Sequence, residues 1–143
     1  MRVVLDTNTV ISSLFWRGLP GKVYDAAIAG RYTLLTSDPL IYEFEQVLRR
    51  PKFAPLLKAA QYDIDQILAK YRNLAEFIPL IELPLGIVRD PNDRMVLACA
   101  MSGNAGYVVS GDKDLLVLGN YQTISILSTV QFLEILSPHS NLE

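Results

Sequence analysis

The chain has 143 residues, of which half are apolar and a fifth are charged, a composition that indicates one globular domain and excludes a disordered chain. The net charge of −2 is not typical of nucleic-acid-binding domains, which are usually basic. No apolar run is long enough to cross a membrane, and the single Cys99 excludes an internal disulfide and fits a reducing cytoplasm. Because Met1 leads directly into an apolar strand, we expect no signal peptide.

In the first half of the chain, strands are predicted to alternate with helices. The expected elements are a strand at 2–5, a loop and then a helix at about 21–29, a strand at 32–36, and a helix from 38 to about 50. Ser37 is expected to cap that last helix, with Pro39 in its first turn and Pro51 at its end.

The second half continues this alternation. The expected elements are a helix at 62–77, a short edge strand at 78–82, a helix from Asp90-Pro91-Asn92-Asp93 to Gly103, strands at 107–110 and 123–127, and a closing helix from Ser128. Such alternation predicts an α/β fold with a mainly parallel sheet covered on both faces. We expect one domain over 1–136, followed by a polar C-terminal tail at 137–143.

Four carboxylates stand where predicted elements begin or end, or beside an apolar stripe. Asp6 follows the first predicted strand, and Asp112 follows the fourth. Glu43 lies at the edge of its helix's apolar stripe, and Asp93 lies in the first turn of another helix. In a parallel α/β fold these positions gather at one edge of the sheet. Two such charges about 4 Å apart would repel by roughly 4 kcal/mol at an effective dielectric of about 20, so a divalent metal between them is expected.

Each of these acids also has a purely structural explanation. Asp6 would form a turn or cap, and Asp112 would form an Asx-turn and cap a short helix. Asp93 would complete a capping box with Asp90, which satisfies the first amides of that helix. For Glu43, a salt bridge and a metal-ligand role remain equally open.

The chemistry of these ligands favours a hard cation. Oxygen ligands select Mg²⁺ or Mn²⁺ rather than zinc, and His139 in the polar tail is a poor ligand candidate. One or two ions about 4 Å apart would activate a water and stabilise the leaving oxygen of a phosphodiester. Lys113 or Arg94 would contact a phosphate, although either is equally explained as a surface charge. Without these four acids, the chain has 11 acidic and 13 basic residues, so we expect the remaining surface to be mildly basic.

The motifs, taken together, resemble the PIN domain, and more narrowly the VapC-like toxin ribonucleases of toxin–antitoxin pairs. The matching segments are Asp6-Thr7-Asn8, Glu43, Asp90-x-x-Asp93 and Ser110-Gly111-Asp112-Lys113-Asp114. The resemblance covers roughly residues 1–136 and implies a three-layer α/β/α sandwich.

The resemblance also implies roles for individual residues. The catalytic and metal-binding set would be Asp6, Glu43, Asp93 and Asp112. Asn8 and Ser110 would orient these ligands or a bound water, and Asp114 joins such sites in some members, while Asp90 would act as the helix cap alone.

The implied function is that of a cytoplasmic endoribonuclease that depends on Mg²⁺ or Mn²⁺ and cuts single-stranded RNA. A small antitoxin protein and a homodimer are implied as partners. The alternative is a non-catalytic PIN-like module that binds RNA or protein, against which the four intact acids argue. A haloacid-dehalogenase-type phosphatase needs a second Asp where Asn8 stands, and a response-regulator receiver needs an adjacent acidic pair, so both readings are weak.

Overall fold

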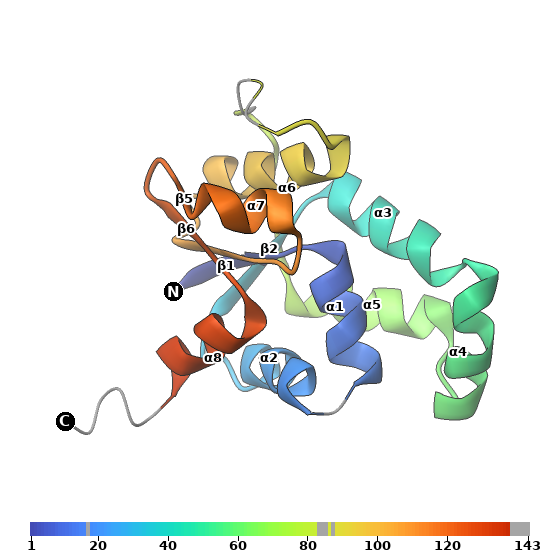
Figure 1. Ribbon diagram of the computed structural model, residues 1–143. Coiled ribbons are helices and arrows are strands. Elements are labelled where there is room, and N and C mark those ends of the chain that lie inside the picture. Colours follow the sequence, from blue (N-terminus) through green and yellow to red (C-terminus); the bar gives the residue numbers. More distant parts are fainter. Residues whose placement is uncertain (17, 83–85, 87, 138–143) are drawn as a thin grey trace.

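The computed structural model describes residues 1–16, 18–82, 86 and 88–137. One sheet has the strand order β3-β2-β1-β4-β6-β5, and neighbouring strands are parallel except β5 and β6 (Figure 1). The strands are β1 (Arg2–Leu5), β2 (Thr33–Thr36), β3 (Glu76–Phe77), β4 (Tyr107–Val109), β5 (Asn120–Tyr121) and β6 (Ile124–Leu127). This is the mainly parallel sheet that the sequence pattern predicts.

Helices flank both faces of this sheet, which gives three layers (Figure 1). They are α1 (Thr7–Phe15), α2 (Leu19–Ile28), α3 (Asp38–Leu48), α4 (Ala54–Ala60), α5 (Ile64–Leu74), α6 (Pro91–Ser102), α7 (Lys113–Leu118) and α8 (Thr129–Leu136), with a short 3-10 helix η1 (Pro51–Phe53) before α4. Helices α1, α2 and α8 cover one face, and α6 and α7 cover the other. Within the described residues, no helix is long and apolar enough to span a membrane.

Successive residues of the central strands point into two separate hydrophobic clusters. Val3 and Leu5 of β1 join the cluster that includes α1, α2 and α8, whereas Val4 joins the cluster that includes α6. In β4, Val109 and Val108 divide between the clusters in the same way. Since both faces of the sheet are buried, these strands appear in the sequence as unbroken apolar runs.

The strand order reverses beside β1. From β1 the chain passes to β2 and β3 on one side, and then returns to β4 on the other side. Ligands of open parallel sheets bind outside the carboxyl ends of the strands at such a reversal. Asp6 directly follows β1 and Ser110 directly follows β4, so both residues lie at this position.

Two of the helices, α1 and α4, are not predicted from the sequence. Helix α1 begins with Thr7-Asn8-Thr9, residues that favour turns, but the buried side chains of Val10 and Ile11 tie it to the core. Helix α2 begins at Leu19 and takes Pro20 into its first turn, where the sequence pattern indicates a loop.

The predicted strand at 78–82 is wrong. The edge strand is instead β3, which pairs with β2 through Glu76 and Phe77. The Ile78 amide still donates to the Thr36 carbonyl, but the next residue, Pro79, has no amide hydrogen to continue the ladder.

The short strand β5 is also not predicted. Of the predicted polar tail, residues 138–143 lie outside the described residues.

Candidate metal centre

A small acidic pocket of about 80 Å³ lies at the carboxyl edge of β1 and β4. The described residues that line it are Asp6, Thr7, Asn8, Glu43, Asp90, Asn92, Asp93, Val96 and Asp112. The pocket therefore brings together all four carboxylates that the sequence nominates as ligands, from the end of β1, α3, α6 and the turn after β4.

Asp6 is fixed by two hydrogen bonds on opposite oxygens. Its Oδ1 accepts from the Thr9 amide at 2.9 Å, which caps α1, and its Oδ2 accepts from the Ser110 hydroxyl at 2.5 Å. The side chain is only 7% exposed. The capping role expected for Asp6 is therefore present, and the same carboxylate still faces the pocket.

Ser110 links the two strand ends beneath the pocket. Its hydroxyl donates to Asp6 and also accepts from the Asp112 amide at 2.9 Å, and the residue is fully buried. Asp112 in turn caps α7, because its Oδ1 accepts from the Asp114 amide at 2.8 Å. Ser110 thus holds two of the acids in a fixed relation through a single side chain.

Glu43 is held by a residue that sequence reasoning does not single out. The Thr7 hydroxyl donates to Glu43 Oε1 at 2.5 Å, which ties α3 to the first turn of α1. Glu43 is half-buried and forms no ion pair with a described residue, so the salt-bridge explanation has no support here. Thr7 follows Asp6 directly in the chain, and that adjacency is the signal that would have identified it.

Asp93 is the most unusual group in the pocket. It is 6% exposed, and its buried Oδ2 has no hydrogen-bond partner within the described residues. Burial raises the pKa of Asp93 from 3.8 to about 7, with further contributions from contact with Asp112 and from the charges of Asp90 and Asp6. The repulsion expected among clustered acids therefore appears at this group.

The capping box predicted for Asp90 and Asp93 is only half formed. Asp90 Oδ1 accepts from the Asn92 amide at 2.8 Å, but the carboxylate of Asp93 turns toward Asp112. Asp90 also lines the pocket, beside its position as the cap of α6. Oxygens of Asp90, Asp93 and Asp112 lie within 4.8 Å of one another, a spacing that suits a single cation.

The remaining predicted residues are placed less centrally. Asn8 lines the pocket, while Asp114, Lys113 and Arg94 are not among the described residues that line it. Asp114 and Lys113 are exposed on α7 beside Asp112. The Arg94 guanidinium donates to the Arg89 carbonyl at 3.3 Å.

These residues fit a hard divalent cation. The donor atoms are carboxylate oxygens, as Mg²⁺ and Mn²⁺ prefer, and the unpartnered buried oxygen of Asp93 gains a partner if a cation binds. Carboxylate oxygens that already accept a hydrogen bond, as in Asp6 and Glu43, keep a second lone pair for a metal.

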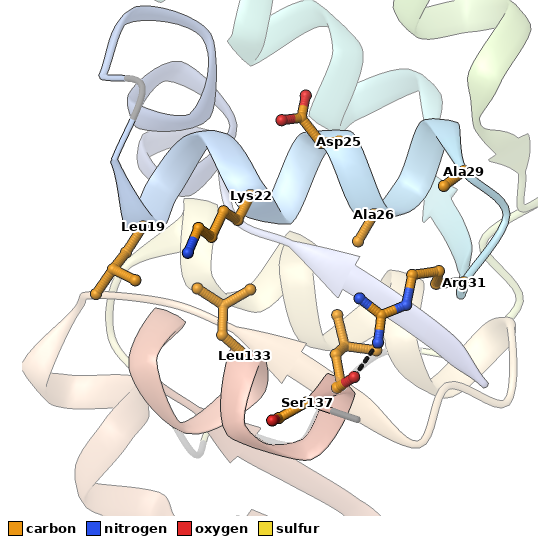
Figure 2. Close-up of a pocket in the computed structure, with 9 residues that line it drawn as sticks. Leu19, Lys22, Asp25, Ala26, Ala29, Arg31, Leu133 and Ser137 are labelled. Atoms are coloured by element: carbon orange, nitrogen blue, oxygen red, sulfur yellow. Dashed lines mark hydrogen bonds between the residues drawn. The ribbon is translucent and has the colours of Figure 1, made fainter. Parts of the chain in front are cut away.

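A larger groove of about 470 Å³ lies between α2 and α8 and has a different chemistry (Figure 2). Lys22 and Arg31 supply its positive charges, and Leu19 and Leu133 supply apolar surface. Of the described residues that line it, Asp25 is the only acid. The described residues of this groove therefore do not present the clustered carboxylates that the acidic pocket has.

The comparisons with known proteins agree with this geometry. A family model described as PIN domain matches residues 2–114. The chain belongs to the PIN domain family. That match spans every acid of the pocket, from Asp6 to Asp112.

The PIN fold is also found among solved structures. One match is a chain in the crystal structure of VapBC2 from Rickettsia felis bound to a DNA fragment from their promoter. Its TM-score is 0.60 and its sequence identity 12%, and the match covers 90% of this chain and 98% of that chain. At this identity the likeness establishes a shared fold. No curated protein matches the chain.

Proposed function

We propose that this PIN-domain protein is an endoribonuclease that uses Mg²⁺ or Mn²⁺ to hydrolyse phosphodiester bonds in single-stranded RNA. The observation that carries the proposal is the convergence of Asp6, Glu43, Asp93 and Asp112 on one pocket in which a buried Asp93 oxygen has no partner. Membership of the PIN family supports a nuclease, because PIN domains generally are nucleases.

In the proposed site the four carboxylates hold one or two ions, and Asp90 would join them, which the spacing of its oxygen from those of Asp93 and Asp112, within 4.8 Å, supports. A bound ion supplies an activated water and charge stabilisation at the leaving oxygen. The protein's own contribution is to orient the ligands: Ser110 fixes Asp6, and Thr7 fixes Glu43. Such supporting hydrogen bonds set the position and basicity of metal ligands.

Polar and cationic residues at the rim are proposed to act on the substrate. Asn8 would orient a ligand or a water at the pocket wall, and Asp114 would support the site from α7. Lys113, exposed beside Asp112, and Arg94 on α6 would contact a phosphate of the strand. A phosphate contact needs only a positive charge within reach, which a surface lysine or arginine provides.

We further propose that the protein acts in the cytoplasm as the toxin of a toxin–antitoxin pair, binds a small antitoxin and forms a homodimer. The solved structure with the shared fold is described as VapBC2 bound to promoter DNA, which supports a protein partner of this kind. The second candidate function is a non-catalytic PIN-like module that binds RNA or protein. The raised pKa of Asp93 favours the catalytic candidate, because perturbed acids concentrate at functional sites.

The test is cleavage of a mixed single-stranded RNA pool with Mn²⁺ or Mg²⁺, beside Asp6→Asn and Asp112→Asn. We expect metal-dependent cleavage that both variants lose. Asn keeps a side-chain oxygen to cap α1 or α7, so lost activity reports lost charge and not a lost helix. If the wild type does not cleave the RNA, calorimetry with Mn²⁺ on the same sample decides between the candidates. Mn²⁺ binding by the wild type that is lost in Asp93→Asn would support the metal site. If the wild type binds no Mn²⁺, the non-catalytic module is the function that remains.

A further inference from the structure

We propose that Trp16 is a stacking platform for a base of single-stranded RNA, on the same exposed side of α1 that leads to the acidic pocket. This inference rests on the proposed function, because it takes RNA as the substrate and names a second contact for it. Trp16 has no part in the metal site, so the two proposals stand or fall on different measurements.

The first observation is the exposure of Trp16. It is the only tryptophan of the chain, and it remains 50% exposed although it is the largest aromatic side chain available to the core. It lies at the C-cap of α1, where its amide donates to the Ser12 carbonyl and fixes its backbone. An indole exposed to this extent leaves ring surface free to contact a ligand.

The second observation is that one other aromatic ring, Phe15, contacts this side chain. The rings of Phe15 and Trp16 meet edge to face with centroids 6.0 Å apart, which covers at most one face of the indole. Phe15 in turn stacks on Phe53 at 5.9 Å and packs against Tyr62 at 5.9 Å. Trp16 therefore contacts the outermost ring of an aromatic cluster, and this contact reduces the entropy that Trp16 loses when a ligand stacks on it.

The third observation is the charge around this aromatic cluster. Lys52 Nζ lies 5.2 Å from the centroid of Phe53, and Lys70 lines a hollow together with Tyr62. Asp63 also lines that hollow, and its Oδ1 accepts from the Asp65 amide as the cap of α5. Sites that bind single-stranded nucleic acid combine aromatic rings with nearby lysines, because the bases stack on the rings and the phosphates contact the cations.

The fourth observation is the direction of α1. Residues four apart lie on the same side of a helix, and Asn8, Ser12 and Trp16 follow that spacing. Asn8 lines the acidic pocket, and eight residues of helix separate it from Trp16 by about 12 Å. A strand lying along this side would place a phosphodiester at the acids and a base a few nucleotides away on the indole.

A fluorescence titration tests the proposal, since the only tryptophan is the platform itself. Wild-type protein in EDTA, and Asp6→Asn with Mn²⁺, would be titrated with a mixed-sequence single-stranded RNA of about 12 nucleotides. We expect saturable quenching of Trp16 emission by this RNA and none by the same sequence annealed to its complement, whose bases are already stacked.

Variants give the second readout, the dissociation constant of a labelled RNA measured by anisotropy. Trp16→Ala should weaken binding about tenfold, and Trp16→Phe, which keeps a ring, should weaken it less. Ile28→Ala removes an apolar side chain of similar exposure on α2 and should leave binding unchanged. Thermal melts of each variant exclude a folding defect as the cause.

The outcomes separate the two proposals. RNA that quenches Trp16 in EDTA, but that the wild type does not cut once Mn²⁺ is supplied, supports the platform and counts against the nuclease. If Trp16→Ala cleaves and binds RNA as the wild type does, the nuclease proposal stands and the platform proposal is overturned. Emission that RNA does not change, but that shifts with protein concentration as a dimer forms, would assign this surface to a second copy of the chain and also overturn the proposal.

Discussion

At the scale of single residues, one hydroxyl organises the acidic pocket. Ser110 joins the carboxyl ends of β1 and β4, since it donates to Asp6 and accepts from the Asp112 amide. The residue is completely buried, so water does not replace either bond when the hydroxyl is removed. The position of Ser110 explains how two acids from distant parts of the chain, Asp6 and Asp112, are held close together.

Ser110→Ala tests this role. We expect a loss of about 1–3 kcal/mol in the free energy of unfolding, because Asp6 and the Asp112 amide lose a buried partner. The affinity for Mn²⁺ should fall about tenfold to a hundredfold, as for other residues that support metal ligands. Denaturant unfolding and calorimetry measure the two effects. Ser125→Ala, which removes an exposed bond to Asn120, is the control, and equal effects in both variants would contradict the role.

Asp93 gives a prediction about pH. Its pKa is raised from 3.8 to about 7 in the folded protein, so between these values the folded state binds a proton that the unfolded state has released. Stability of the metal-free protein should therefore fall as pH rises from about 4 to about 7. The loss should be on the order of 1 kcal/mol, because the pocket opens to solvent and water screens the charges.

Thermal melts in EDTA across this pH range measure the effect. Asp93→Asn cannot titrate, and its melting temperature should show a correspondingly weaker dependence on pH. An identical pH dependence in wild type and variant would assign the effect to other groups.

At the scale of elements, the end of α6 controls how that helix meets the sheet. A Cβ added at Gly103 would lie 2.9 Å from Leu35 Cδ1 and 3.1 Å from the Cys99 carbonyl oxygen. The side chain of Leu35 has some freedom to move, but the backbone oxygen does not. Gly103 is therefore required for close packing of α6 against β2, and α6 carries Asp93.

Gly103→Ala should lower the free energy of unfolding by about 1–3 kcal/mol, the usual effect of overpacking. Gly106→Ala is a matched control three residues away, because a Cβ there has nothing within 4 Å. Denaturant unfolding of the two variants makes the comparison. A loss in Gly106→Ala as large as in Gly103→Ala would show that space at the end of α6 is not the cause.

At the scale of the whole molecule, the fold holds like charges together. Burial, together with the contact with Asp112 and the charges of Asp112, Asp90 and Asp6, raises the pKa of Asp93, and these acids come from three separate regions of the chain. Packing of the sheet and helices is what forces them into proximity. A ligand that neutralises them should therefore stabilise the entire fold.

Mn²⁺ at about 100 times its dissociation constant should stabilise the protein by about 2.7 kcal/mol, or roughly 5–10 °C in melting temperature. Differential scanning calorimetry with and without the ion measures the shift. Asp112→Asn should lose most of it. If saturating Mn²⁺ does not raise the melting temperature of the wild type, the proposal of a metal site is wrong.

The sequence alone determined the fold class and most of the strands. Strands β1, β2 and β4 have buried residues on both faces of the sheet, whereas buried and half-buried residues alternate along β6; both patterns are visible in the local sequence. Helix α6 was equally clear, because Asp90 and Pro91 mark its start. Helix α1 was not, since its polar first turn favours a turn locally and only burial of Val10 and Ile11 makes it helical.

For the acidic pocket, the sequence nominated the four carboxylates that line it and Ser110 as a support, but not Thr7. Local patterns place an acid at the end of a strand, whereas a contact such as Thr7 with Glu43 joins residues that are 36 positions apart. Whether Asp90 only caps α6 or also faces the pocket depended on how α6 meets the turn after β4. Exposure of Trp16 was likewise decided by tertiary packing, because a tryptophan in the sequence is equally compatible with the core and the surface. Short-range chemistry decides most of the elements and the residues that they carry, whereas long-range packing decides elements such as α1 and which side chains meet.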